Sequence, residues 1–298
     1  MNSKIVIGTW PLSGDYGKVE SNQVKNVLEY CYQNGIKEFD TAPNYGNGFM
    51  EKILGEVFKN KDDVLLNTKM GNFPFKKKSY EIKDLKESFE NSLKILKKDS
   101  INILFLHNPR TEITDYTEVL NYMNELKDKK VIRYIGLSKA KKFNYEDFVK
   151  LNEFDIIQED INLLNLQALK KSKRNGVMLM ARSPLASGLL SGRITAKTVF
   201  SNDDQRATWL HGKRLESIVY RINEIRKHSD VELSELAIRF LQNQSLIDKI
   251  IFGVKRKEHV KNLLEQVDKK PLEPIIIKKL FELFENDFGL IDESDYAY

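Results

Sequence analysis

Eight short apolar runs of β type alternate with amphipathic helical stretches along this 298-residue chain. Parallel strands that are buried on both faces have such continuous apolar runs. Eight strand–helix units in a chain of this length are typical of a (β/α)8 barrel. A doubly wound sheet is the alternative, but no G-x-G-x-x-G follows the first run. We therefore predict an α/β fold, a TIM-type barrel formed as one domain by residues 1–298. Its strands are expected at Ile5–Gly8, Ile36–Asp40, Val64–Lys69, Ile101–His107, Ile132–Leu137, Ile156–Gln158, Val177–Ala181 and Lys249–Phe252.

The first helix shows the signals that place the others. Ser21 is a favourable N-cap residue, and Asn34-Gly35 provides the left-handed backbone that ends helices. Between them, apolar residues recur at the spacing of one helix face. Further helices are expected at Phe49–Phe58, along Leu85, Phe89, Leu93 and Leu96, and at Tyr116–Lys129, Tyr145–Leu151, Leu166–Arg174, Arg214–His228 and Glu258–Val267.

Two segments depart from the repeat. Leu189–Lys213 is a polar stretch after the seventh strand, and loops of this length are usually lids or binding loops. An apolar helix after Pro274 follows the last barrel unit. We predict that this extra helix packs against the side of the barrel.

Composition excludes several classes of protein. Hydrophobic residues make up 41% and charged residues 31% of the chain, as in globular proteins. No apolar run approaches the roughly 18 residues of a membrane helix. The net charge is only +5, and the lysines are spread over helix faces, so we expect no nucleic-acid partner. Cys31 is the only cysteine, which excludes an intrachain disulfide and a cysteine-based metal site. We expect a cytoplasmic protein that binds a small molecule; its oligomeric state stays open.

Four chemically active side chains lie at or just beyond three successive strand ends. Asp40, Lys69 and His107 end the second, third and fourth strands, and Tyr45 lies in the loop after Asp40. In such barrels these ends meet at one mouth. A phenol titrates near ~10, and a neighbouring ammonium lowers that pKa, while a carboxylate keeps the ammonium charged. Each residue alone has an ordinary structural interpretation. Together they indicate proton donation to a developing alkoxide, with His107 hydrogen-bonding the substrate oxygen.

The segment around these residues has the spacing of a known signature. F-D-T-A-P-N-Y-G-N-G-F-M-E-K-I-L-G resembles the pattern D-T-A-x-x-Y-G-x-G-x-x-E-x-x-L-G of the aldo-keto reductase superfamily. More matches follow in the family's order along the chain. They are N-T-K, L-F-L-H-N-P, I-R-Y-I-G-L-S, Gln158, R-S-P-L-A-S-G-L-L-S-G-R and I-F-G-V-K-R-K-E-H-V.

The resemblance implies a (β/α)8 fold and NADPH-dependent reduction of an aldehyde or ketone. It implies that Tyr45 is the general acid, tuned by Lys69 and Asp40, and that His107 orients the carbonyl. No metal is implied. The residues implied to bind NADPH/NADP+ are Ser138 and Gln158 at the nicotinamide carboxamide, Arg182, Ser183, Leu185, Gly188 and Gly253 along the cofactor, and Lys255 and Arg256 at the adenosine 2′-phosphate.

The chain also departs from the family pattern. Lys139 replaces the usual Asn, and Asn262-Leu263 replaces the usual Glu-Asn pair near the adenosine, so NADH is not excluded. Most of the N-terminal hairpin that plugs the barrel in many members is expected to be absent.

The substrate stays open at this point. Trp10, Asn108, Arg110 and Trp209 are expected to line the pocket, with Arg182 and Arg206 nearby. Several guanidinium groups at one mouth favour an anionic carbonyl compound, and a sugar-like carbonyl is the alternative. For Arg206 the alternative role is pairing with Asp203 or Asp204. A cofactor-binding regulatory module with little turnover is the alternative to an enzyme.

Overall fold

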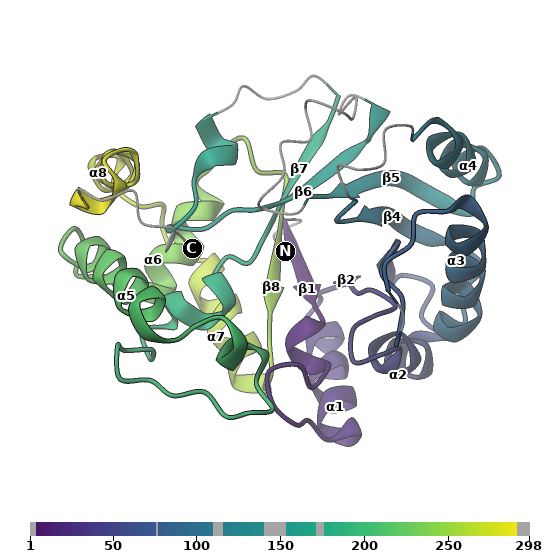
Figure 1. The fold of residues 1–298 in the computed structure, drawn as a ribbon, viewed down its shortest axis with the longest axis horizontal. Coiled ribbons are helices and arrows are strands. Elements are labelled where there is room, and N and C mark those ends of the chain that lie inside the picture. Colours follow the sequence, from purple (N-terminus) through teal and green to yellow (C-terminus); the bar gives the residue numbers. More distant parts are fainter. Residues whose placement is uncertain (1–3, 76, 110–115, 140–152, 171–175, 291–298) are drawn as a thin grey trace.

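The strands of the computed structural model close into a parallel barrel (Figure 1). Each strand pairs with the next, and β1 pairs with β8 to complete the ring. The structure describes residues 4–75, 77–109, 116–139, 153–170 and 176–290. The predicted (β/α)8 barrel is confirmed. The strands are β1 (Ile5–Gly8), β2 (Glu38–Asp40), β3 (Leu65–Met70), β4 (Ile101–His107), β5 (Ile132–Ser138), β6 (Ile156–Asp160), β7 (Met178–Arg182) and β8 (Lys249–Gly253).

Helices surround the barrel on its outside (Figure 1). They are α1 (Ser21–Gln33), α2 (Phe49–Phe58), α3 (Ile82–Leu96), α4 (Thr117–Asp128), α5 (Gly212–Arg226), α6 (Leu233–Gln242), α7 (Lys257–Val267) and α8 (Pro274–Glu285). The helix predicted at Tyr145–Leu151 lies outside the described residues. The described part of the predicted helix Leu166–Arg174 contains only a short 3-10 helix, Gln167–Lys170.

Side chains of the strands belong to two separate clusters, one inside the barrel and one between the strands and the helices, because successive residues of a strand point to opposite faces. Ile5 and Ile7 of β1 belong to the large core cluster that includes the helices, whereas Val6 between them belongs to a small inner cluster. The inner cluster consists of Val6, Ile103, Phe105, Ile156, Met180 and Ile251. The barrel is therefore a packed core, and ligands are restricted to its ends.

Several predicted boundaries were wrong. The residue that caps α1 is Glu20, and Ser21 is the first helical residue. β2 starts at Glu38 because the backbone N–H of Ile36 donates to the carbonyl of Cys31, which leaves Ile36 in the turn that ends α1. Helix α6 was not predicted, although its buried residues have helical spacing, because we expected one helix between the last two strands.

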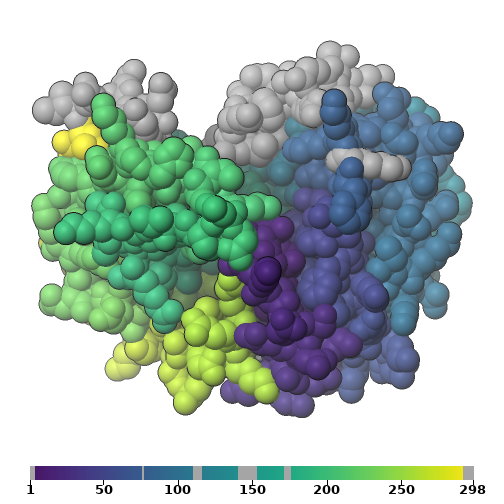
Figure 2. Space-filling view, turned by 60° about the horizontal axis from the view of Figure 1, so that its bottom comes forward, coloured from purple at the N-terminus to yellow at the C-terminus, as the bar shows by residue number. Residues whose placement is uncertain are grey.

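The segment after β7 contains more structure than predicted. Two 3-10 helices, Ala186–Ser191 and Gln205–Thr208, interrupt it, and α5 begins at Gly212. Asp204 forms an antiparallel β-bridge with Tyr16 in the loop after β1. Figure 2 shows the green segment after β7 against the purple N-terminal segment.

The extra C-terminal helix is present. α8 lies beside α5 and α6 on the outside of the barrel (Figure 1). Its Phe281 ring packs 5.5 Å from that of Phe240 on α6, which confirms the predicted packing against the barrel side. In the described part of the chain, no helix is both long and apolar enough to traverse a bilayer. The extent of the domain, residues 1–298, remains our proposal.

Candidate active site

A buried ion pair lies at the carboxyl ends of β2 and β3. The Lys69 ammonium donates to Asp40 Oδ1 at 2.5 Å and to the carbonyl of Thr41 at 2.7 Å. Both side chains are almost fully buried. Burial alone would lower the pKa of Lys69, but Asp40 and Tyr45 outweigh it, and the pKa is raised. Lys69 is therefore a fixed positive charge at this end of the barrel.

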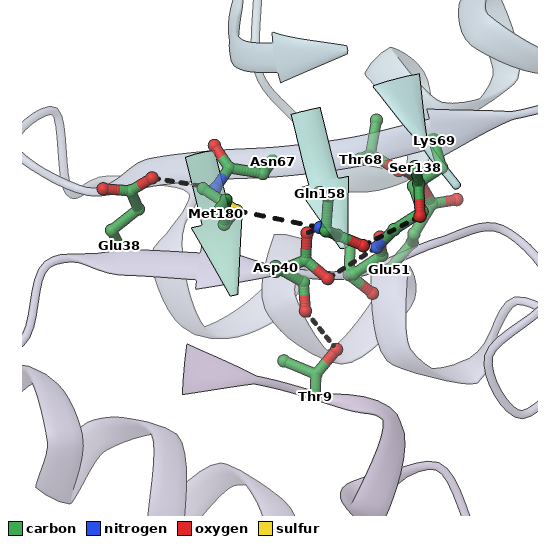
Figure 3. A network of polar contacts seen from close by, with 11 residues as sticks. Thr9, Glu38, Asp40, Glu51, Asn67, Thr68, Lys69, Ser138, Gln158 and Met180 are labelled. Atoms are coloured by element: carbon green, nitrogen blue, oxygen red, sulfur yellow. Dashed lines mark hydrogen bonds and ion pairs between the residues drawn. The ribbon is translucent and has the colours of Figure 1, made fainter. Parts of the chain in front are cut away.

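Gln158 connects this pair to the other side of the barrel. Its Nε2 donates to the second oxygen of Asp40 at 3.0 Å, and its Oε1 accepts from the Ser138 hydroxyl at 2.9 Å (Figure 3). Ser138 ends β5, whereas Gln158 is followed by two more residues of β6. Two residues predicted to bind a cofactor amide thus belong to the same hydrogen-bonded chain as Asp40 and Lys69.

Tyr45 completes the cluster from the loop after β2. Its hydroxyl faces the Lys69 ammonium, which lies 5.0 Å from the ring centroid. The ring stacks on Trp10 at 6.1 Å and meets the His107 ring edge-on at 6.2 Å. Burial raises the pKa of Tyr45 and outweighs the lowering by Lys69, so the net shift is opposite to the predicted direction. The phenol therefore stays protonated until a strong base takes its proton.

His107 is a neutral imidazole. Burial, then the charges of Lys69, Arg182 and Lys78, lower its pKa well below the usual range. Its Nδ1 has no hydrogen-bond partner among the described residues. A neutral, buried imidazole beside a phenol can hydrogen-bond a substrate oxygen without adding charge.

Residues predicted to bind the cofactor lie after β7 and β8. The backbone is left-handed at Ser183, Ala186, Ser187 and Gly188, a conformation that persists only where surrounding structure imposes it and that is frequent at ligand sites. Gly253, the last residue of β8, is exposed and approaches Pro11 so closely that a Cβ would lie 2.7 Å from the Pro11 Cγ. Leu185, between Ser183 and Gly188 in the sequence, is half-buried.

Positive charges gather beyond the end of β8. Lys255 donates to the carbonyl of Tyr16, and Arg206 is salt-bridged to Asp204 at 2.6 Å, the pairing considered for it from the sequence. Burial, then the charge of Arg206, lower the pKa of Lys255, and Arg256 contributes in the same direction. Because the three cations Lys255, Arg206 and Arg256 outnumber the two carboxylates Asp203 and Asp204 that act on Lys255, the cluster fits an anionic group such as the phosphates of a dinucleotide.

The predicted substrate residues are only partly brought together. Trp10 contacts Tyr45, and Asn108 follows His107 with its Oδ1 buried and without a partner in the described structure. The Trp209 ring lies 5.1 Å from the guanidinium of Arg214. Arg110 lies outside the described residues.

Two features of the site were missed. Lys139 forms a salt bridge with Glu159 at 2.9 Å, and Arg182 donates to the backbone carbonyl of Lys139 at 2.7 Å. Tyr16 hydrogen-bonds Ser187 at 3.4 Å and bridges to Asp204. No sequence periodicity signals either feature, because each joins segments that are far apart along the chain.

Comparison with known proteins decides the family. The model of the aldo/keto reductase family matches residues 4–283. This chain belongs to the aldo/keto reductase family. It is therefore an oxidoreductase that uses a nicotinamide cofactor and acts on small-molecule carbonyl compounds.

Individual relatives of this aldo-keto reductase differ in their described roles. An Arabidopsis thaliana protein described as a probable voltage-gated potassium channel subunit beta is 25% identical and covers 95% of this chain and 93% of its own length. An NADH-specific methylglyoxal reductase of Escherichia coli is 24% identical over 87% of this chain and 88% of its own. In fold, a glycerol dehydrogenase of Gluconobacter oxydans superposes with a TM-score of 0.80, at 21% identity over 98% of this chain and 94% of its own.

Proposed function

We propose that this aldo-keto reductase reduces an aldehyde or ketone to an alcohol with NADPH, and that Tyr45 is the general acid. The observation that carries the proposal is the placement of the Tyr45 hydroxyl against Lys69, which is itself held by Asp40 at 2.5 Å. The Lys69 charge stabilises the phenolate that Tyr45 becomes when its hydroxyl protonates the substrate oxygen.

Each residue has a distinct role in the proposed reaction. When bound, the cofactor supplies the hydride. His107 hydrogen-bonds the carbonyl oxygen and orients it without protonating it, because its pKa is well below the usual range. Tyr45 gives its proton to the oxygen as negative charge develops there, since an alkoxide is a stronger base than a phenolate. Lys69 stabilises the phenolate that remains, and Asp40 keeps Lys69 in place.

The cofactor is proposed to be held by residues at the carboxyl ends of β5, β6, β7 and β8 and in the loops that follow them. Ser138 and Gln158 offer hydrogen bonds to the carboxamide, and Lys255 and Arg256 offer charge to the 2′-phosphate of NADPH. NADH stays an alternative, supported by the description of the Escherichia coli relative. The other proposed contacts are Arg182, Ser183, Leu185, Gly188 and Gly253.

Replacing Lys255 with Met tests the cofactor assignment. Loss of a charge-assisted hydrogen bond to the 2′-phosphate costs about 1.5–3 kcal/mol, so we expect the Kd for NADPH to rise roughly 10- to 100-fold. The Kd for NADH should change little. Fluorescence titration measures both constants, and Lys261→Met on the exposed side of α7 is the control. An equal loss for NADPH and NADH would contradict the assignment of the 2′-phosphate.

A substrate panel tests the reaction and its substrate class. The charges of Arg182 and Lys78 act on His107, which supports an anionic carbonyl compound, and the unpartnered Asn108 Oδ1 supports a hydroxylated, sugar-like one. We expect consumption of NADPH, measured by the loss of its absorbance, with aldehydes of both kinds. A phosphorylated aldehyde should have a lower KM than its neutral analogue, and equal KM values would remove the anionic preference.

A regulatory module with little turnover is the second candidate. The description of the Arabidopsis thaliana relative as a channel subunit favours it. The same panel separates the two candidates, because tight NADPH binding without turnover of any carbonyl compound would support the module.

A further inference from the structure

Glu51 is a buried carboxyl group that the proposed reaction does not use. It lies in the first turn of α2 and is 1% exposed. The Thr68 hydroxyl on β3 donates to its Oε1 at 2.6 Å (Figure 3). No salt bridge joins Glu51 to another described residue, and a carboxyl group is rarely buried so completely without one, so its position calls for an explanation.

The hydrogen bond joins the two segments that carry Tyr45 and Lys69. The loop with Tyr45 runs directly into α2, and the N–H of Met50 donates to the Tyr45 carbonyl at 3.3 Å. Thr68 immediately precedes Lys69 on β3. Glu51 therefore connects the element that begins at the phenol to the strand that ends at the ammonium.

Close packing against α3 keeps Glu51 in this position. Gly55 lies one turn after Glu51, on the same side of α2. A Cβ at Gly55 would lie 2.2 Å from the Ile95 carbonyl oxygen of α3, so only glycine permits this approach. Ser92 of α3 lies near enough to lower the pKa of Glu51, although its hydroxyl makes no hydrogen bond of normal geometry with a described residue.

The charge of Glu51 changes near neutral pH. Burial raises its pKa to about 7, whereas the hydroxyls of Thr68 and Ser92 and the charge of Lys69 act in the opposite direction. On the neighbouring α1, Lys25 is salt-bridged to Glu56 at 2.7 Å. Among the described charged groups, Lys69 is the one that acts on Glu51.

We propose that Glu51 is a positioning residue that holds Tyr45 against Lys69, and that its carboxylate form weakens the field of Lys69 at the Tyr45 phenol. This inference rests on the proposed role of Tyr45. A second negative charge beside Lys69, in addition to Asp40, makes the phenolate less stable and the phenol a weaker acid. Reduction is therefore faster while Glu51 is neutral, and its rate falls as pH rises through about 7.

The test compares wild type, Glu51→Gln, Thr68→Val and Thr68→Ser. Single-turnover reduction of an active aldehyde is measured at saturating NADPH from pH 6 to pH 8, which removes effects of the cofactor site. His107 and Tyr45 are not expected to titrate in this window, because burial lowers the pKa of His107 well below its usual value and raises the pKa of Tyr45 above its usual value. We expect wild type to slow several-fold with rising pH. Glu51→Gln keeps an acceptor for the Thr68 hydroxyl but cannot ionise. Its rate at pH 8 should therefore equal its rate at pH 6 and match that of wild type at pH 6.

The Thr68 variants test the connection itself. Thr68→Val removes the donor at constant shape and should lower kcat several-fold at every pH, with the Kd for NADPH unchanged. Thr68→Ser restores the hydroxyl and should restore kcat. A parallel pH profile for wild type and Glu51→Gln, or equal kcat for the Val and Ser variants, would overturn the inference while leaving the reductase assignment intact. A wild-type protein that turns over no carbonyl compound would instead overturn the proposed function and this inference with it.

Discussion

Tyr45→Phe is expected to lower kcat by about 10²- to 10⁴-fold, the usual contribution of a general acid. The substitution removes the phenol proton that faces Lys69 while retaining the ring that stacks on Trp10 and meets His107. The cofactor Kd should be unchanged, because the lost hydroxyl lies at the substrate side of the proposed site. Steady-state turnover and fluorescence titration measure the two quantities.

An exposed tyrosine provides the control for this substitution. Tyr220 of α5 is 41% exposed and far in sequence from the site, so Tyr220→Phe should behave as wild type. If Tyr45→Phe retained most of its activity, Tyr45 could not be the acid, and the proton would have to come from another group or from water.

Lys69→Met is the second change with a large expected effect. It leaves the Asp40 carboxylate buried without its ammonium, and breaking one partner of a buried ion pair costs about 3–5 kcal/mol. The free energy of unfolding should fall by that amount. Activity should be lost as well, since the Tyr45 phenolate would have no counter-charge.

A double variant separates the two losses. Asp40→Asn in the Lys69→Met background removes the unpaired charge, so much of the stability should return while the activity does not. Lys25→Met is the control, because Lys25 pairs with Glu56 at the surface, where ion pairs contribute little to stability. Denaturant unfolding measures all four proteins. A Lys69→Met protein as stable as the control would show that Asp40 is not held as an ion pair.

The barrel and the four-residue cluster could be predicted because both depend on local signals. Strand ends such as that of His107 follow continuous apolar runs, and parallel strands bring those ends together. What could not be predicted are contacts between distant loops, such as the bridge from Tyr16 to Asp204, and the balance of opposing electrostatic effects. The direction of the Tyr45 shift was wrong for the second reason: the sequence shows the neighbouring ammonium but not how deeply the phenol is buried.

Gln158 has a further consequence through its simultaneous bonds to Asp40 and Ser138. A ligand that takes over one of these bonds alters the proton affinity of the Asp40–Lys69–Tyr45 set. Thermodynamic linkage is reciprocal, so the protons held by that set must alter the affinity for the ligand by the same factor. If the cofactor carboxamide takes over one of these bonds, as proposed, cofactor binding and proton uptake are one coupled equilibrium, and the proton stoichiometry of cofactor binding measures the strength of the coupling.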